Sequence, residues 1–172
     1  MTMPKLSSND SDVQPLRPDA NQVRRILVLG YGNPGREDDG LGPAAAAEIE
    51  RMGWLNVTVC NNYQLVIEDV VDIAAADIVW FIDASRNGPE PYATQKLSPA
   101  MDITFTSHIV SPEVLLAMAE QYYGKSPRAY LMGIRGYDFE FVERLSDRAA
   151  TNLKQAVTLL LSLVKDGEEP KG

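Results

Sequence analysis

The side chains best suited to hold a divalent metal ion are an aspartate of the pair Asp38-Asp39, the aspartate Asp83 and the only histidine of the chain. Asp38 and Asp39 lie in a glycine-rich stretch that follows an apolar run, and Asp83 ends a second apolar run. The histidine is His108. Two carboxylates and one imidazole form a mixed oxygen and nitrogen ligand set, which suits nickel, zinc or iron better than a thiolate-preferring ion. Three protein ligands also leave metal positions open for a further ligand.

Each of these residues also has a purely structural interpretation. Asp38 and Asp39 are typical of a solvated pair that caps the next helix. Asp83 fits a cap or a turn, and His108 fits an ordinary surface histidine. The three positions together favour a metal site more than any one of them alone. Their spacing by itself is not a specific motif, so both interpretations stay open at this point.

Short apolar runs alternate with segments of helical periodicity along the chain. The predicted strands are 26–30, 57–60, 78–82 and 129–134, with an edge strand at 92–98. The predicted helices are 43–52, 64–76, 111–123 and a last helix that is capped by Ser146 and Asp147. Ser111 and Gly124 mark the start and the end of the third helix. Asn61 and Asn62 are predicted to form a turn.

This alternation predicts an α/β fold. We expect a single domain over residues 23–166, a three-layer sandwich with a mostly parallel twisted sheet of about five strands and helices on both faces. Residues 1–22 are polar and are predicted to be a disordered tail, and residues 167–172 a charged C-terminal tail. Ligands of such sheets bind at the carboxyl ends of the strands. The 30–42 loop and Asp83 both lie at strand ends, where they can be neighbours.

Gly30, Gly32 and Gly35 match the G-x-G-x-x-G pattern of a dinucleotide-binding loop. That pattern requires a helix N-terminus at the pyrophosphate, whereas here the acidic run 36–40 intervenes. Its three consecutive carboxylates would repel a pyrophosphate. The second strand also ends without the acid that holds a ribose. These features argue against a nucleotide-binding oxidoreductase. It stays open as a third interpretation, which a thermal shift with NAD or NADP would test.

Nucleophilic catalysis has little support in the sequence. Cys60 ends a predicted strand, where a buried apolar role fits it, and no second histidine is present to activate it. Ser107 adjoins His108, but the chain holds no G-x-S-x-G motif. The chemistry is therefore not expected to use a serine or cysteine nucleophile.

Composition excludes several kinds of partner. The 172 residues carry 16 Lys and Arg against 24 Asp and Glu, a net charge of −8. Nucleic acids and anionic membrane surfaces are bound through clustered Lys and Arg, so neither is expected. No apolar run approaches the about 18 residues of a membrane span, and the first residues hold no secretory signal. One cysteine excludes an intrachain disulfide, and we expect a cytoplasmic monomer.

The segment Ile26–Gly42, ILVLGYGNPGREDDGLG, resembles the N-terminal signature of the hydrogenase maturation endopeptidases, G-x-G-N-x-x-x-x-D-[DE]-x-x-G. The resemblance continues through Tyr63-Gln64-Leu65, through Phe81-Ile82-Asp83-Ala84, and through Ser107-His108 with the helix start that follows. It covers residues 24–165, nearly the whole chain.

The resemblance implies a protease that removes the C-terminal extension from the large-subunit precursor of a [NiFe]-hydrogenase after nickel insertion. It implies that Asp39, Asp83 and His108 contact that nickel, which the substrate carries. Some family members have Glu where this chain has Asp39, with the same carboxylate chemistry. The ion would polarise the scissile carbonyl, or would activate a water with Asp39 or Asp83 as the base.

The remaining residues of the signature are interpreted as support for the loop. Gly30, Gly32 and Gly42 permit its backbone conformation, and Asp38 and Asn33 fix it by accepting hydrogen bonds from backbone N–H groups. A non-catalytic alternative uses the same site: a metal-dependent assembly chaperone that holds the nickel-loaded subunit without cutting it. Both functions need the same ligands, so the sequence does not separate them.

Overall fold

The computed structural model describes residues 23–101 and 110–170. The strands are β1 (Ile26–Tyr31), β2 (Val57–Asn62), β3 (Ile78–Ser85), β4 (Tyr92–Leu97) and β5 (Arg128–Arg135). The helices are α1 (Leu41–Glu50), α2 (Val70–Ala75), α3 (Pro112–Tyr123) and α4 (Asp147–Asp166), with 3-10 turns η1 (Glu37–Gly40) and η2 (Ile67–Asp69). The predicted tail over residues 1–22 lies outside the described residues.

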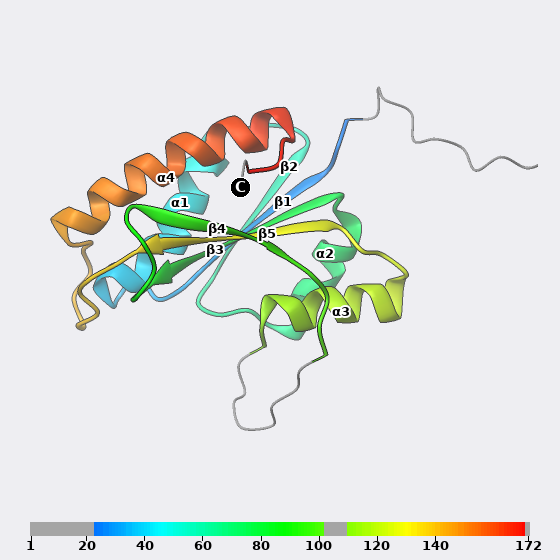
Figure 1. Cartoon of the computed structure of the whole chain (residues 1–172), viewed down its shortest axis with the longest axis horizontal. Helices are drawn as coiled ribbons and strands as arrows, with labels where there is room; N and C mark the ends of the chain where they lie inside the picture. Colours follow the sequence, from blue (N-terminus) through cyan, green and yellow to red (C-terminus); the bar gives the residue numbers. More distant parts are fainter. Residues whose placement is uncertain (1–22, 102–109, 171–172) are drawn as a thin grey trace, which may run out of the picture.

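The strands form one twisted sheet between two layers of helices (Figure 1). The strand order is β2-β1-β3-β5-β4, in which the first four strands run parallel and the edge strand β4 is antiparallel to β5. The expected α/β sandwich with five mostly parallel strands is therefore confirmed. Within the described ranges, no helix is both long enough and apolar enough to cross a membrane.

Each face of the sheet has its own core. Helices α1 and α4 cover one face around Trp80 and Tyr130, whose stacked rings have centroids 5.0 Å apart. Helices α2 and α3 cover the other face around Leu29 and Phe81. Burial on both faces explains why β1 and β3 are continuous apolar runs rather than alternating ones.

Strands β2 and β3 extend furthest beyond their predicted ends. Asn61 and Asn62 belong to β2 and not to a turn, because they pair in register with the last two residues of β1. Strand β3 continues past Asp83 to Ser85, because β5 pairs with it over this length. Ladder hydrogen bonds from the neighbouring strand thus override the turn preference of short polar residues.

The helix limits follow local signals where the sequence carries them. Ser111 caps α3 by accepting a hydrogen bond from the N–H of Val114 at 3.4 Å, and the helix ends at Gly124 with a left-handed φ of 62°. Ser146 caps α4. These limits confirm the predictions. The predicted helix over 64–76 forms only as η2 and α2, because Val66 has an extended backbone.

Candidate functional site

Strands β1 and β3 lie side by side and parallel, so their carboxyl ends meet at one edge of the sheet (Figure 1). The loop 31–42 leaves β1 at this edge, and Asp83 follows Ile82 in β3. Here the start of α1 packs closely against both strands. The approach is so close that a Cβ at Gly42 would overlap the carbonyl oxygens of Tyr31 and Ile82. A glycine at this position therefore allows the loop to close onto the edge.

Two further glycines bring the loop back on itself. A Cβ at Gly32 would overlap the carbonyl oxygen of Asp39, and Gly32 has a φ of 137°, which other residues rarely adopt. A Cβ at Gly30 would overlap the carbonyl oxygen of Gly42. These close backbone approaches place Asp39 beside the end of β1.

Hydrogen bonds within the loop orient the Asp39 carboxylate. Its Oδ2 accepts a hydrogen bond from the backbone N–H of Asn33 at 3.0 Å. The side-chain oxygen of Asn33 accepts one from the N–H of Gly35 at 2.9 Å. Asn33 therefore holds the local turn with its side chain and holds Asp39 with its backbone.

The carboxyl group of Asp83 has a perturbed pKa. Burial raises this pKa to about 6, the N–H of Ala84 lowers it by donating a hydrogen bond at 2.7 Å, and the negative charge of Asp39 raises it. Asp39 and Asp83 are thus close enough for their charges to repel. A cation between two such carboxylates offsets the repulsion, so the pair can supply two oxygen ligands to a divalent ion.

Two side chains that the sequence patterns did not single out lie near the pair. Burial raises the pKa of the Tyr31 hydroxyl far above its ordinary value, and the charges of Asp83 and Glu113 raise it further. Tyr31 in turn lowers the pKa of Asp83. Glu113 belongs to the first turn of α3, so α3 begins at this edge. The place of Tyr31 between two glycines was the only sequence signal for its role.

Asp38 is fully buried and contacts a different part of the chain. Its Oδ2 accepts hydrogen bonds from the N–H groups of Tyr137 and Asp138 at 2.7 and 3.0 Å. Ser146 donates from its N–H to Oδ1 and from its hydroxyl to Oδ2, each at 2.8 Å. Burial alone would raise the pKa of Asp38, but these hydrogen bonds hold it below its ordinary value. Asp38 therefore fastens η1 to the segment between β5 and α4.

Glu37 makes a second connection to that segment. Its Oε2 accepts a hydrogen bond from the N–H of Glu140 at 3.1 Å, and its own N–H donates to the carbonyl oxygen of Val142 at 2.8 Å. Glu37 has a φ of 46°, an unusual value for a residue with a side chain. These two contacts stabilise that conformation. Glu37 and Glu140 lie 103 positions apart in the sequence, so no local sequence pattern predicts this contact.

The third predicted ligand, His108, lies outside the described residues, as does Ser107. Among residues 23–101 and 110–170, no group of three or more His, Cys, Asp or Glu side chains could hold a metal ion. The structure brings Asp39 and Asp83 together, and the histidine ligand stays a prediction.

Cys60 is half-buried in β2. Burial raises the pKa of its thiol, and the charges of Asp72, Asp69 and Glu50 raise it further. A nucleophilic cysteine needs a lowered pKa, so this environment argues against thiolate chemistry.

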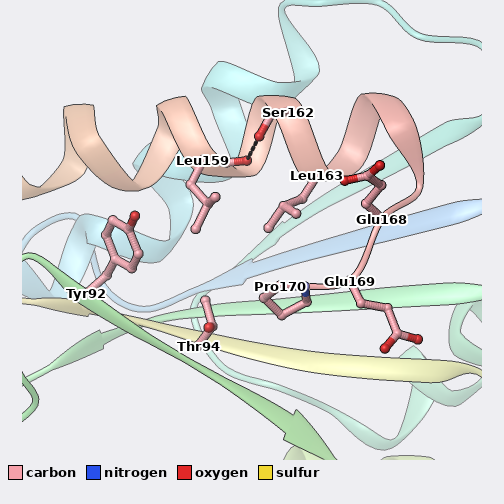
Figure 2. A pocket seen from close by; sticks show the side chains of 8 residues that line it. All are labelled: Tyr92, Thr94, Leu159, Ser162, Leu163, Glu168, Glu169 and Pro170. Carbon is pink, nitrogen blue, oxygen red and sulfur yellow. Dashed lines mark hydrogen bonds between the residues drawn. The ribbon is translucent and has the colours of Figure 1, made fainter. Parts of the chain in front are cut away.

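A cavity of about 450 Å³ lies in another part of the molecule, between β4 and α4 (Figure 2). Tyr92 and Thr94 of β4 lie opposite Leu159 and Leu163 of α4, and the segment Glu168–Pro170 completes the lining. None of the predicted site residues that the structure describes lines this cavity. It is separate from the carboxylate pair.

No family model and no curated protein matches the sequence. Solved structures of hydrogenase maturation proteases match the fold. The [NiFe] hydrogenase maturation protease HycI from Thermococcus kodakarensis has a TM-score of 0.64 and 21% identity, over 83% of this chain and 93% of its own. The hydrogenase maturating endopeptidase HybD from E. coli has a TM-score of 0.64 and 22% identity, over 83% of this chain and 94% of its own.

A third solved structure matches with a similar TM-score and identity. The hydrogenase 2 maturation peptidase from a Thaumarchaeota archaeon has a TM-score of 0.59 and 22% identity, over 82% of this chain and 98% of its own. At these identities the likeness concerns the fold. The chain has the α/β fold of hydrogenase maturation proteases over most of its length, as the sequence resemblance implied.

Proposed function

We propose that this protein is a hydrogenase maturation endopeptidase, which removes the C-terminal extension of a nickel-loaded [NiFe]-hydrogenase large-subunit precursor. The observation that carries the proposal is the Asp39–Asp83 pair at the carboxyl edge of β1 and β3. Asp39 lies within the segment that resembles the signature of this class of protease, and both acids lie within the fold that the chain shares with it. The proposal includes a cytoplasmic location and a monomeric form.

The nickel ion is part of the substrate in this proposal. Asp39 and Asp83 supply two of its ligands, and His108 supplies the third. Glu113 follows His108 by five positions, and its charge raises the pKa of Tyr31 at the same edge. That position of α3 supports the histidine as the third ligand. Carboxylate and imidazole groups together suit a borderline divalent ion such as nickel.

Recognition through the metal makes cleavage depend on completed nickel insertion. In the protein alone, Asp39 and Asp83 repel each other, and the pKa of Asp83 is about 6. A divalent ion offsets this repulsion and favours the ionised form of both groups. Metal-free precursor offers the pair no such ion, so it is expected to bind weakly.

The carboxylates also serve the chemistry once the precursor is bound. Asp83 or Asp39 accepts a proton from the attacking water, a role that requires the ionised form that the divalent ion favours. The ion polarises the scissile carbonyl in the same step. Binding holds the scissile carbonyl beside the base, which lowers the entropic cost of reaching the transition state.

The test compares nickel-loaded with metal-free precursor. Each is mixed with the purified protein, and loss of the C-terminal peptide is followed by mass spectrometry. We expect cleavage of the loaded precursor only. Equal cleavage of both contradicts nickel recognition. A stable complex with the loaded precursor and no change in its mass identifies an assembly chaperone instead.

A further inference from the structure

Two arginines flank the carboxylate pair in the sequence. Arg36 lies three positions before Asp39, and Arg86 lies three positions after Asp83. Arg36 belongs to the loop after β1, and Arg86 directly follows β3. Because both strands end at the same edge, both arginines belong to the rim of the candidate site.

Aromatic side chains of residues 137–143, the aromatic segment between β5 and α4, contact both guanidinium groups. The Cζ atom of Arg36 lies 5.0 Å from the ring centroid of Phe141, and that of Arg86 lies 3.6 Å from the ring centroid of Phe139. Arg36 also donates through Nη2 to the carbonyl oxygen of Phe139 at 3.3 Å. Stacking on a ring orients a guanidinium group and leaves N–H groups at its edge for a partner.

The aromatic segment is itself fixed relative to Asp39. The hydrogen bonds of Asp38 with Tyr137 and Asp138 and that of Glu37 with Glu140 fasten it to η1. Asp39 belongs to the same η1 turn. Both guanidinium groups are therefore held against a segment that is fixed to the same turn as Asp39.

Neither guanidinium group is neutralised by a carboxylate among the described residues. The arginine ion pairs found there belong to Arg25, Arg51, Arg128 and Arg148. The aromatic segment carries Asp138, Glu140 and Glu143, but none of them forms an ion pair with Arg36 or Arg86. Among the described residues, both guanidinium groups therefore keep their positive charge available to a carboxylate of a partner.

The same segment exposes apolar surface next to the arginines. Phe141 is 82% exposed and Val142 is 42% exposed. An exposed aromatic ring beside an arginine is a combination enriched in protein–protein interfaces. The rim thus fits a polypeptide that carries both carboxylate and apolar side chains.

We infer that Arg36, Arg86, Phe141 and Val142 form a docking surface for a carboxylate-bearing, partly apolar segment of the precursor. This inference rests on the proposed function and adds a second contact to the one made through nickel. The guanidinium group of Arg86 can donate two N–H groups to one carboxylate, and that of Arg36 can donate through Nη1 while its Nη2 bonds to Phe139. Arginines at the same edge of the sheet as the acid pair would orient the precursor as its nickel reaches Asp39 and Asp83.

The test measures cleavage of nickel-loaded precursor by Arg36→Gln, Arg86→Gln and the double variant. We expect KM to rise about tenfold for each substitution, with kcat retained, because a charge-assisted contact is lost outside the reacting centre. Added salt should raise the KM of the wild-type protein more than that of the double variant. Arg51→Gln is the control, since Arg51 lies on the exposed end of α1.

The outcomes separate this inference from the proposed function. Cleavage by the double variant with the KM and salt dependence of the wild type overturns the docking surface and leaves the proposed function intact. Failure of the wild-type protein to cleave the loaded precursor removes both. A change in oligomeric state with an unchanged KM assigns the surface to contacts between copies of this chain, which also overturns the inference. Arg86→Gln decides the matter alone if Arg36→Gln does not fold.

Discussion

Asp38 accepts hydrogen bonds from both the backbone N–H and the hydroxyl of Ser146, each at 2.8 Å. Ser146 is also the N-cap of the 20-residue helix α4. One buried acid thus joins the loop after β1 to the last helix, across 108 positions of the sequence. The loop that carries Asp39 is therefore held by a distant part of the chain as well as by its own hydrogen bonds.

Replacing Asp38 should destabilise the whole fold. Asp38→Ala leaves the donors of Tyr137, Asp138 and Ser146 without their buried acceptor, so we expect the free energy of unfolding to fall by about 3 kcal/mol or more. Urea unfolding measures this. Asp138→Ala is the matched control, because its side chain is exposed and its loss should cost at most about 0.5 kcal/mol. Equal losses for the two variants contradict the role given to Asp38.

Asp83 should lower the stability of the metal-free protein at neutral pH. Its pKa is about 6 in the folded protein and about 4 in an unfolded chain, so the folded state binds more protons between these values. Its contribution to the free energy of unfolding therefore falls as the pH rises from about 4 to about 6, by about 3 kcal/mol in total. Asp83→Asn removes this dependence.

The measurement is urea unfolding of both proteins with a chelator present. We expect wild-type protein and Asp83→Asn to have similar stability at pH 4, and the variant to be more stable at pH 8. A variant that is less stable than the wild type at pH 8 contradicts the raised pKa.

Substitution of Gly42 should destabilise the protein more than substitution of a glycine that has open space around it. Gly42→Ala introduces a Cβ into the carbonyl oxygens of Tyr31 and Ile82, so we expect a loss of about 2 to 3 kcal/mol and slow cleavage as Asp39 shifts. Gly124→Ala meets no atom within 4 Å and should cost about 1 kcal/mol for its left-handed φ. Thermal unfolding and the cleavage rate are measured together; normal cleavage by Gly42→Ala would show that the loop adjusts.

The predicted ligands should each be required for processing. Asp39→Ala, Asp83→Ala and His108→Ala are expected to abolish removal of the C-terminal peptide while circular dichroism stays that of the wild type. Asp72→Ala, an exposed acid in α2, is the control and should cleave normally. Normal processing by His108→Ala would remove the histidine from the ligand set.

Tyr31 should tune the acid limb of the pH profile. The hydroxyl of Tyr31 lowers the pKa of Asp83, so Tyr31→Phe is expected to raise that pKa and to shift the acid limb of kcat/KM to higher pH. Tyr63→Phe is the control, because Tyr63 is 75% exposed. An unshifted profile for Tyr31→Phe would separate Tyr31 from the catalytic pair.

Local patterns in the sequence were enough to predict most elements. The runs 26–30 and 78–82 are apolar throughout, which indicates strands buried on both faces. Ser111 and Gly124 predicted the limits of α3, because caps depend on residues within one helical turn. Parallel strands end at one edge, which is why the 30–42 loop and Asp83 could be considered together before the strand order was known.

The sequence by itself determined the fold class, the helix caps and the residue types from which the candidate site is built. Only the tertiary structure decided that β1 lies beside β3, that Asn61 and Asn62 join β2, and that Asp38 binds a segment about a hundred positions away. Strand pairing and buried hydrogen bonds depend on distance in space and on the exclusion of water. Neither quantity is carried by spacing along the chain.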